Sequence, residues 1–187
     1  MQLAALRAAG SKARIIITAR YPFQAEAAEK LGADEVLSGG DLYAQIEERT
    51  AGRLYTPILG KRVMVGGVDM TFDCVAVGST IDDAFRLTRS GGKVVIVGMP
   101  GLEKGIDWSP VFDKELTIVA SYIYNHADVW QGETRTTYDI ALEMMAGGDL
   151  DLGWMISRRY RLDEYGRALS EFRDKKNHPI IKSVFEF

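Results

Sequence analysis

Short runs of apolar residues recur along the chain, separated by segments with the spacing of amphipathic helices. Val94 to Val97 is an uninterrupted apolar run, and Arg14 to Thr18 is rich in β-branched residues. Runs without polar alternation indicate strands buried on both faces, as in a parallel sheet covered by helices on each side. The pattern therefore predicts an α/β fold with a doubly wound parallel sheet.

Helices and strands alternate through the first two thirds of the chain. The first predicted helix, Gln2 to Ala9, ends at Gly10, and the second opens at Pro22 and stops at Gly32. The segment from Ala51 to about Val68 is expected to be a long loop. The other predicted helices are Asp41 to Thr50 and Ile81 to Arg89. The other predicted strands are Glu35 to Leu37, Thr71 to Val75, Lys93 to Val97 and Leu116 to Tyr122.

The alternation changes after the last of these strands. A long helix from about Thr134 to Ala146 is followed by two glycines, a strand from Ser157 to Arg161, another helix and a terminal strand. We therefore expect two parts, residues 1–123 and residues 124–187.

Composition places the chain among globular proteins. Of its 187 residues 47% are hydrophobic and 26% charged, and 23 basic against 26 acidic side chains leave a net charge of −3. Without a basic excess, binding to nucleic-acid phosphates is not expected, and the run from Leu116 to Ala127 is too short to span a bilayer. One cysteine and two histidines exclude a disulfide framework and a cysteine-rich zinc module, so a reducing, cytoplasmic setting is expected.

Several segments are similar to one protein family. LGADEV follows an alanine-rich helix in the run from Leu3 to Leu37, and the tail contains AGGDLDLGWMISRRYRLDEYGRAL and IIKSVFEF. Between them stand FDCV at 72–75, IDDAFRLTRSGGKVVIVGMP at 81–100 and KELTIVASY at 114–122. The chain resembles the C-terminal half of medium-chain, zinc-dependent alcohol dehydrogenases. This implies a partial Rossmann-type dinucleotide-binding domain at 1–123 and a C-terminal segment of the catalytic domain at 124–187.

The family's first half is outside the resemblance. That half supplies the zinc ligands, the first strand of the sheet and the glycine-rich turn that holds the pyrophosphate of the cofactor. Neither Gly39-Gly40 nor Gly66-Gly67 has the spacing of such a turn, and both pairs are expected to be ordinary turns. The predicted sheet therefore lacks its first strand, and zinc is expected only in a full-length protein.

The activity that the resemblance implies is hydride transfer between an alcohol, polyol or hydroxy amino acid and a nicotinamide cofactor. Because the zinc ligands are missing, the chain alone is expected to be inactive. The family also implies a homo-oligomer with a contact near Leu102 to Lys114. A non-catalytic nucleotide-binding or oligomerising module is the alternative, since a missing strand leaves an exposed sheet edge.

The cofactor preference depends on the end of the second family strand. An acidic residue there binds the adenosine ribose of NAD, but this chain has Ala19 followed by Arg20. A carboxylate repels a 2′-phosphate whereas a guanidinium pairs with it, so the pattern favours NADP over NAD. The alternative is that Arg20 is a solvated arginine at a strand end.

Further cofactor contacts are implied at the ends of later strands. Val97, Gly98 and Met99 would line the nicotinamide, with Gly98 allowing close approach of the backbone. The backbone groups of Ser121 and Ile123 would bind the carboxamide. A routine glycine between strand and loop is the alternative for Gly98.

The remaining sequence-based hypotheses concern Cys74, Val75, Lys182 and the pair Asp82-Asp83. Cys74 and Val75 match an apolar wall near adenine and ribose, although Ala76 stands where many relatives carry glycine, and Cys74 is expected to be a buried, inert thiol in a strand. Lys182 matches a basic position that reaches the pyrophosphate, with an outward-facing lysine as the alternative. Asp82-Asp83 after Ser79-Thr80 predicts a hydroxyl cap with acids in the first helical turn, without a catalytic role.

Overall fold

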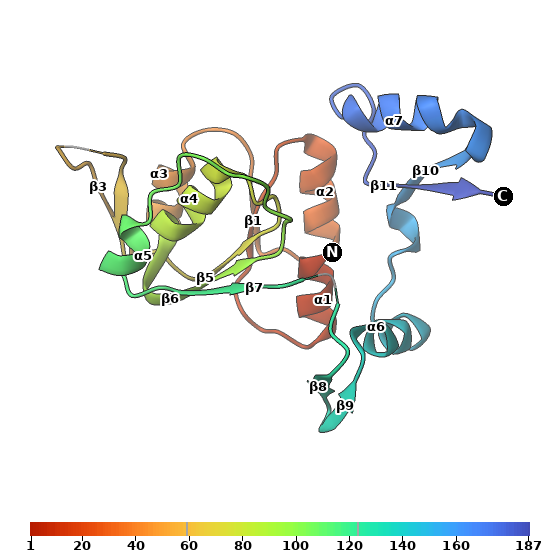
Figure 1. Ribbon diagram of the computed structural model, residues 1–187, viewed down its shortest axis with the longest axis horizontal. Helices are drawn as coiled ribbons and strands as arrows, with labels where there is room; N and C mark the ends of the chain where they lie inside the picture. Colours follow the sequence, from red (N-terminus) through yellow and green to blue (C-terminus); the bar gives the residue numbers. More distant parts are fainter. Residues whose placement is uncertain (59, 123) are drawn as a thin grey trace. The chain divides into compact units, whose positions relative to one another are not determined.

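The computed structural model describes residues 1–58, 60–122 and 124–187. These residues form two compact units, the first joining Met1–Gly39 to His126–Phe187 and the second comprising Gly40–Asn125 (Figure 1). The expected division of the sequence into 1–123 and 124–187 stays a prediction. Within the described part of the chain, no helix has the length and apolar character needed to cross a membrane.

A three-stranded parallel sheet is at the centre of the second unit. Strand β6 (Thr88–Ile96) lies between β5 (Val68–Asp73) and β7 (Thr117–Ala120) and pairs with both in parallel. Val94, in the apolar run of β6, is completely buried, as expected for a strand that packs against a helix. The structure thus confirms parallel pairing of the predicted strands. It corrects the end of β5, which stops at Asp73, two residues before the predicted end.

Helix α4 (Gly78–Leu87) connects β5 to β6 and packs on one face of the sheet (Figure 1). The next connection, from β6 to β7, contains the short helix α5 (Ser109–Asp113). The apolar core of the unit is formed by Ala76, Ile81, Ala84, Phe85 and Val94. Since α4 supplies three of these five side chains, its position on the sheet determines how the core is filled.

The segment expected to be a long loop is instead an antiparallel hairpin, formed by β3 (Arg53–Tyr55) and β4 (Val63–Val65). It follows helix α3 (Leu42–Arg49). Met64 is completely buried, and a Cβ built on Gly67 would lie 2.1 Å from the carbonyl oxygen of Leu87 at the end of α4. Gly67, one of the glycines that suggested a loop, therefore allows the base of the hairpin to pack against a helix.

A buried group of charges joins α4 to its surroundings. Arg86 is 2% exposed and its guanidinium donates to the carboxylates of Asp82, at 3.1 Å, and Asp107, at 2.5 Å. Asp82 is completely buried and also accepts from Lys61 Nζ, at 2.5 Å, and from the N–H of Asp107. The prediction that Asp82 serves in the first turn of a capped helix is wrong, because α4 begins at Gly78 and places Asp82 one turn further in.

The first unit contains two small parallel sheets. In one, β1 (Ile16–Thr18) pairs with β2 (Glu35–Leu37), and helix α2 (Pro22–Lys30) connects the two strands along the chain, in the strand–helix–strand order that the sequence predicted. In the other, β10 (Ile156–Arg161) pairs with β11 (Lys182–Glu186). The remaining elements are α1 (Gln2–Ala8), β8 (Asp128–Trp130), β9 (Glu133–Arg135), α6 (Thr137–Ala146), α7 (Tyr165–Arg173) and single 3-10 turns at Gly153–Met155 and Leu162–Glu164.

Replacement of Gly67 by alanine tests the packing of the hairpin base. Gly67 has φ +106° and its Cβ would overlap the Leu87 carbonyl, so we expect Gly67→Ala to lower the free energy of unfolding by about 3 kcal/mol or more. Gly60→Ala is the matched control, because Gly60 has φ +96° with nothing within 4 Å, and should cost about 1 kcal/mol. Urea unfolding measures both, and equal losses would contradict the packing argument.

Lys114 provides a pH-dependent test of the end of α4. Its buried ammonium donates to the carbonyls of Arg86, at 2.5 Å, and Thr88, at 2.8 Å. Burial, followed by the positive charge of Arg86, lowers the pKa of Lys114 from 10.5 to about 8. The folded chain thus releases this proton at lower pH than the unfolded chain, and the contribution of Lys114 to stability should increase as the pH rises between these values.

The measurement compares urea unfolding of the wild type and Lys114→Met at several pH values across that window. The free energy of unfolding of the wild type should rise relative to that of the variant, because other titrating groups are common to both proteins. A difference that stays constant with pH would show that Lys114 has the same pKa in the folded and unfolded chains.

Candidate functional site

The carboxyl ends of β5, β6 and β7 meet at one edge of the parallel sheet. Cys74, Val75 and Ala76 follow β5, Val97, Gly98 and Met99 follow β6, and Ser121 follows β7. Backbone bonds hold these segments side by side: the N–H groups of Val97 and Gly98 donate to the carbonyl of Asp73, at 2.8 and 2.9 Å, and the N–H of Ser121 donates to the carbonyl of Ile96. Six of the predicted cofactor contacts are therefore brought to one edge. Ile123 lies outside the described residues.

Close packing at this edge depends on Gly98. A Cβ at Gly98 would lie 2.5 Å from the carbonyl carbon of Val75 and 2.8 Å from Cβ of Ala76. The segments after β5 and β6 therefore touch at backbone level. This contact is a structural requirement for glycine within the chain, whether or not a ligand also approaches there.

Ala76 adopts a backbone conformation that suits glycine. Its φ is +59° although it carries a side chain, and it is 1% exposed. The left-handed conformation explains why glycine would fit here.

Apolar side chains at the edge face solvent. Val75 is 60% exposed and Met99 is 90% exposed. Cys74 is also exposed, so the expectation of a buried thiol inside a strand is wrong, because β5 ends one residue earlier, at Asp73. Partial burial raises the pKa of the Cys74 thiol, which keeps it protonated near neutral pH. The edge offers apolar surface of the kind that could cover a planar ring.

Arg20 lines a separate hollow in the first unit. The hollow has a volume of about 440 Å³ and is bordered by Arg20 and Tyr21 at the start of α2, by Ser38 after β2, and by Glu26 and Glu29. The guanidinium of Arg20 lies 5.5 Å from the centre of the Tyr21 ring. Arginine, serine hydroxyl and aromatic ring are suitable contacts for a phosphorylated ribose, whereas the two glutamates oppose an anion there.

Lys182 is the first residue of β11 and is exposed. It is paired in the sheet register with Ile156 of β10. Lys182 and Arg20 belong to the first unit, whereas the six residues at the edge of the sheet belong to the second.

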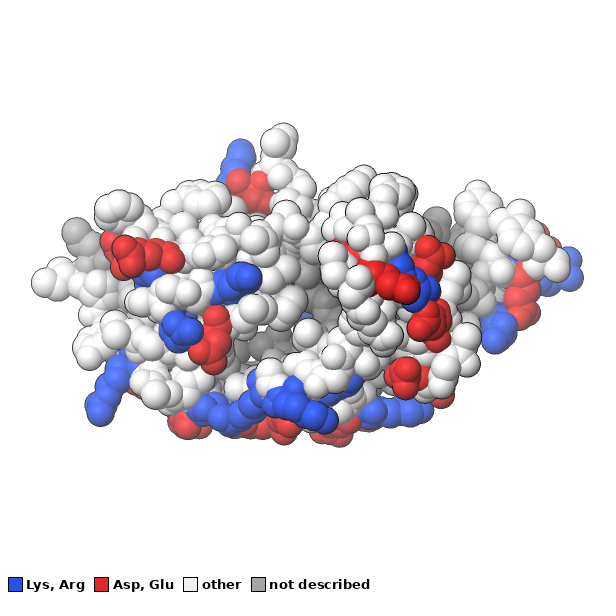
Figure 2. Space-filling view, turned by 90° about the horizontal axis from the view of Figure 1, so that it is seen from below, with Lys and Arg blue, Asp and Glu red and all other residues white. Residues whose placement is uncertain are grey.

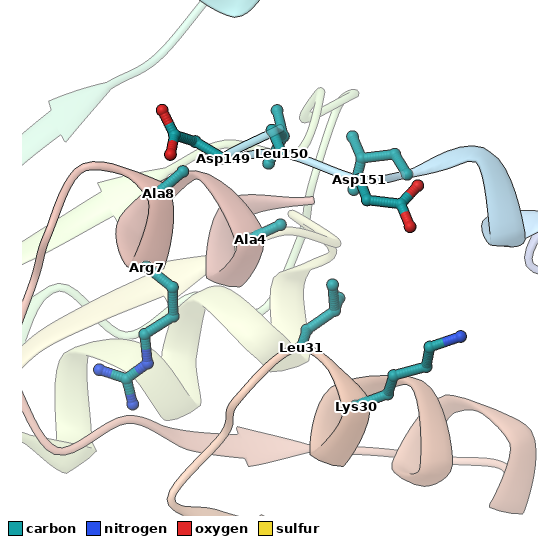
Figure 3. Close-up of a pocket in the computed structure, with 9 residues that line it drawn as sticks. Ala4, Arg7, Ala8, Lys30, Leu31, Asp149, Leu150 and Asp151 are labelled. Atoms are coloured by element: carbon teal, nitrogen blue, oxygen red, sulfur yellow. The ribbon is translucent and has the colours of Figure 1, made fainter. Parts of the chain in front are cut away.

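A second hollow in the first unit has no counterpart in the sequence predictions. It has a volume of about 310 Å³ and lies between α1, the end of α2 and residues 149–152 (Figure 3). Figure 3 shows Arg7 directed away from that segment, and its guanidinium donates to the carbonyl of Gly32 and to Asp34. Lys30 Nζ lies 3.9 Å from the centre of the Trp154 ring. Both cations thus have partners within the chain.

Charge and metal-ligand patterns agree with the composition. In Figure 2 acidic and basic side chains are interspersed over the face shown. Over residues 1–58, 60–122 and 124–187, no three histidine, cysteine, aspartate or glutamate side chains are grouped so that they could hold a metal ion. The described residues therefore do not fit a zinc ion.

Sequence reasoning missed Asp73, a buried carboxylate at the end of β5. Its Oδ1 accepts from the N–H groups of Val75 and Ala76, both at 3.0 Å, and its Oδ2 accepts from the Thr80 hydroxyl at 2.9 Å. The signal was present in the sequence as a lone acid in the apolar segment FDCV. A buried polar group needs hydrogen-bond partners, and here they are supplied by the loop that follows.

Known proteins match the chain over most of its length. The family model for zinc-binding dehydrogenases matches residues 1–144. An L-idonate 5-dehydrogenase of Vitis vinifera is 30% identical over 137 residues, 73% of this chain and 33% of that protein. An L-threonine 3-dehydrogenase of Shewanella woodyi is 25% identical over 181 residues, 97% of this chain and 47% of that protein. The chain spans between a third and a half of the length of these curated relatives.

The fold is also similar to that of a solved structure. A zinc-binding dehydrogenase of Sinorhizobium meliloti 1021, solved bound to NADP, has a TM-score of 0.63 and 27% identity, with coverage of 90% of this chain and 44% of that one. The similarity confirms the expected Rossmann-type α/β fold. It also agrees with the expectation that this chain corresponds to about half of a full-length relative.

Proposed function

Because the chain belongs to the zinc-binding dehydrogenase family, we propose that it supplies the nicotinamide-nucleotide-binding part of an oxidoreductase. The observation that carries the proposal is the meeting of three strand ends at one edge of a parallel sheet, where ligands of open α/β sheets bind. The substrate class would be a small alcohol, polyol or hydroxy amino acid. Relatives named for L-idonate and L-threonine support this class.

When bound, the nicotinamide would supply the carbon that accepts or donates hydride. The chain's own residues would orient and shield it. Val97 and Met99 would cover the nicotinamide ring and Val75 would form part of an apolar wall near the adenine and ribose. Exclusion of water from the ring favours transfer of hydride over side reactions. The N–H of Ser121 already donates to Ile96, so its carbonyl is the backbone group that would accept a hydrogen bond from the carboxamide.

We propose NADP as the preferred cofactor, with NAD as the alternative. Arg20 would pair with the 2′-phosphate at the mouth of the hollow beside Tyr21, and Ala19 leaves no carboxylate at the end of β1 to repel it. A relative bound to NADP supports the choice. Lys182 would act at the pyrophosphate as a cation.

Zinc chemistry and assembly would depend on other parts of the protein. The described residues do not fit zinc, so no step of the reaction is assigned to it in this chain. We further propose a cytoplasmic homo-oligomer with a contact near residues 102–114. In that segment Leu102, Phe112 and Trp108 are exposed, and burial of such side chains would favour association.

The proposed function predicts that NADPH binds to the chain and shields Cys74. Cys74 is the chain's single cysteine and lies at the edge of the sheet, so bound NADPH should slow its alkylation by iodoacetamide. Fluorescence titration measures binding and mass spectrometry measures the alkylation rate. A variant with Cys74→Ser and Ser90→Cys is the control, because its thiol lies near the opposite end of β6 and should react equally with and without NADPH.

Absence of NADPH and NADH binding would contradict the proposal for this chain. If NADPH binds but the alkylation rate of Cys74 does not change, the cofactor binds away from the sheet edge.

The cofactor preference predicts a selective effect of Arg20→Ala. Loss of a charge-assisted pair with the 2′-phosphate should weaken NADPH binding by about tenfold or more, while NADH, which lacks this phosphate, should change little. Arg14→Ala is the matched control, because Arg14 pairs with Glu35 and does not border the hollow. Parallel titrations of both nucleotides make the measurement, and equal losses for NADPH and NADH would refute the role of Arg20.

A further inference from the structure

Asp73 is a buried carboxylate that joins the end of β5 to the residues that follow it through several hydrogen bonds. It is 5% exposed, and its two carboxylate oxygens accept from the N–H groups of Val75 and Ala76 and from the hydroxyl of Thr80. Thr80 lies in the first turn of α4, so the carboxylate links the strand end to the loop and to the helix that follows. All three bonds are 3.0 Å or shorter.

The backbone carbonyl of the same residue holds the neighbouring loop. It accepts from the N–H groups of Val97 and Gly98, which follow β6. The space for a side chain at Gly98 is taken up by Val75 and Ala76. The loop held by the Asp73 side chain thus packs directly on the loop held by its carbonyl.

The side chain also offsets a local conformational cost. Ala76 has φ +59°, a conformation that costs a residue with a side chain on the order of 1–2 kcal/mol. Hydrogen bonds to a charged acceptor are stronger than neutral ones, and one of them ends on the N–H of Ala76. Without the carboxylate, the left-handed conformation of Ala76 would lose a stabilising hydrogen bond. The loop would then be less stable in the conformation that contacts Gly98.

We propose that Asp73 is a positioning residue, whose carboxylate holds the loop 74–77 against the loop 97–99 and thereby sets the affinity for the nicotinamide nucleotide. The second part of this inference rests on the proposed function. Asp73 itself would not contact the cofactor. It acts through Val75, Ala76 and Gly98.

The test compares Asp73→Ala, Asp73→Asn and Thr80→Val in the full chain. Alanine removes all three side-chain bonds, so we expect NADPH binding about tenfold weaker and faster hydrogen exchange at the N–H groups of Val75 and Ala76. Asparagine keeps an acceptor oxygen for these N–H groups and can donate to Thr80, so it should recover most of the affinity. Thr80→Val removes one of the three bonds to the carboxylate, together with the bond that Thr80 Oγ1 accepts from the N–H of Val77, and should have a smaller effect.

Asp82→Asn is the matched control. Asp82 is also a buried acid of this unit, but it bonds to Lys61, Arg86 and the N–H of Asp107, and not to the loops at the edge. It should reduce stability by loosening α4, with a smaller effect on NADPH affinity than Asp73→Ala and with exchange at Val75 and Ala76 unchanged, because it leaves the three Asp73 side-chain bonds in place. Circular dichroism establishes that each variant is folded under the conditions of the titration.

Each outcome decides the inference. Equal weakening of NADPH binding in Asp73→Ala and Asp82→Asn would overturn it, since the effect would then reflect general stability. Unchanged exchange at Val75 and Ala76 in a folded Asp73→Ala variant would also overturn it. If the wild type binds no nucleotide, the proposed function fails, and the exchange measurement alone decides whether Asp73 holds the loops.

Discussion

Burial of Arg86 and Asp82 on α4 is the interaction on which the second unit depends. A guanidinium that is 2% exposed and a carboxylate with no exposure are stable there only because each has several partners. Arg86 bonds to Asp82, to Asp107 and to the carbonyls of Lys61 and Arg62, so the hairpin and the segment before α5 are both attached to one helix. Loss of one partner from such a pair costs about 3–5 kcal/mol. The pair therefore restricts where α4 can lie on the sheet.

The position of α4 in turn constrains the candidate site. The helix begins directly after the loop 74–77 and packs on β5 and β6. At its first turn Thr80 bonds to Asp73, and Gly78 donates its N–H to Glu103 of the segment that follows β6, at 2.7 Å. Two carboxylates from different strand ends thus hold the start of one helix. The edge of the sheet is ordered by contacts within the chain, before any ligand is considered.

The sequence predicted the regular elements well where one physical signal dominated. Pro22 and Gly32 bracket α2, and β2 has the predicted bounds Glu35–Leu37, because local backbone preferences and the apolar pattern agree there. The hairpin was missed because its glycines are typical of loops, while the role of Gly67, close packing on the end of α4, depends on Leu87, twenty positions away. Asp82 was misinterpreted for the same reason. Its partners Lys61 and Asp107 are distant in sequence, and no local pattern indicates burial.

The candidate site was likewise predictable where the apolar pattern located it, and not where it depended on contacts between distant residues. Strand ends can be located from apolar runs, so the meeting of residues after β5, β6 and β7 was predictable from parallel topology. The exposure of Cys74 was not, because it depends on the exact residue at which β5 ends. Asp73 ends the strand by turning its carboxylate onto the next two N–H groups, which a pattern of apolar residues does not reveal.

Ala76 and Gly98 show how the two loops constrain each other. A left-handed alanine costs on the order of 1–2 kcal/mol, and burial of its methyl group returns about 0.8 kcal/mol, so alanine can stand where glycine would be easier. The same methyl group lies 2.8 Å from the position that a Cβ at residue 98 would occupy. A side chain is therefore tolerated on one loop only because the other has none. Substitutions at these two positions should not be independent, since each determines the space that the other has.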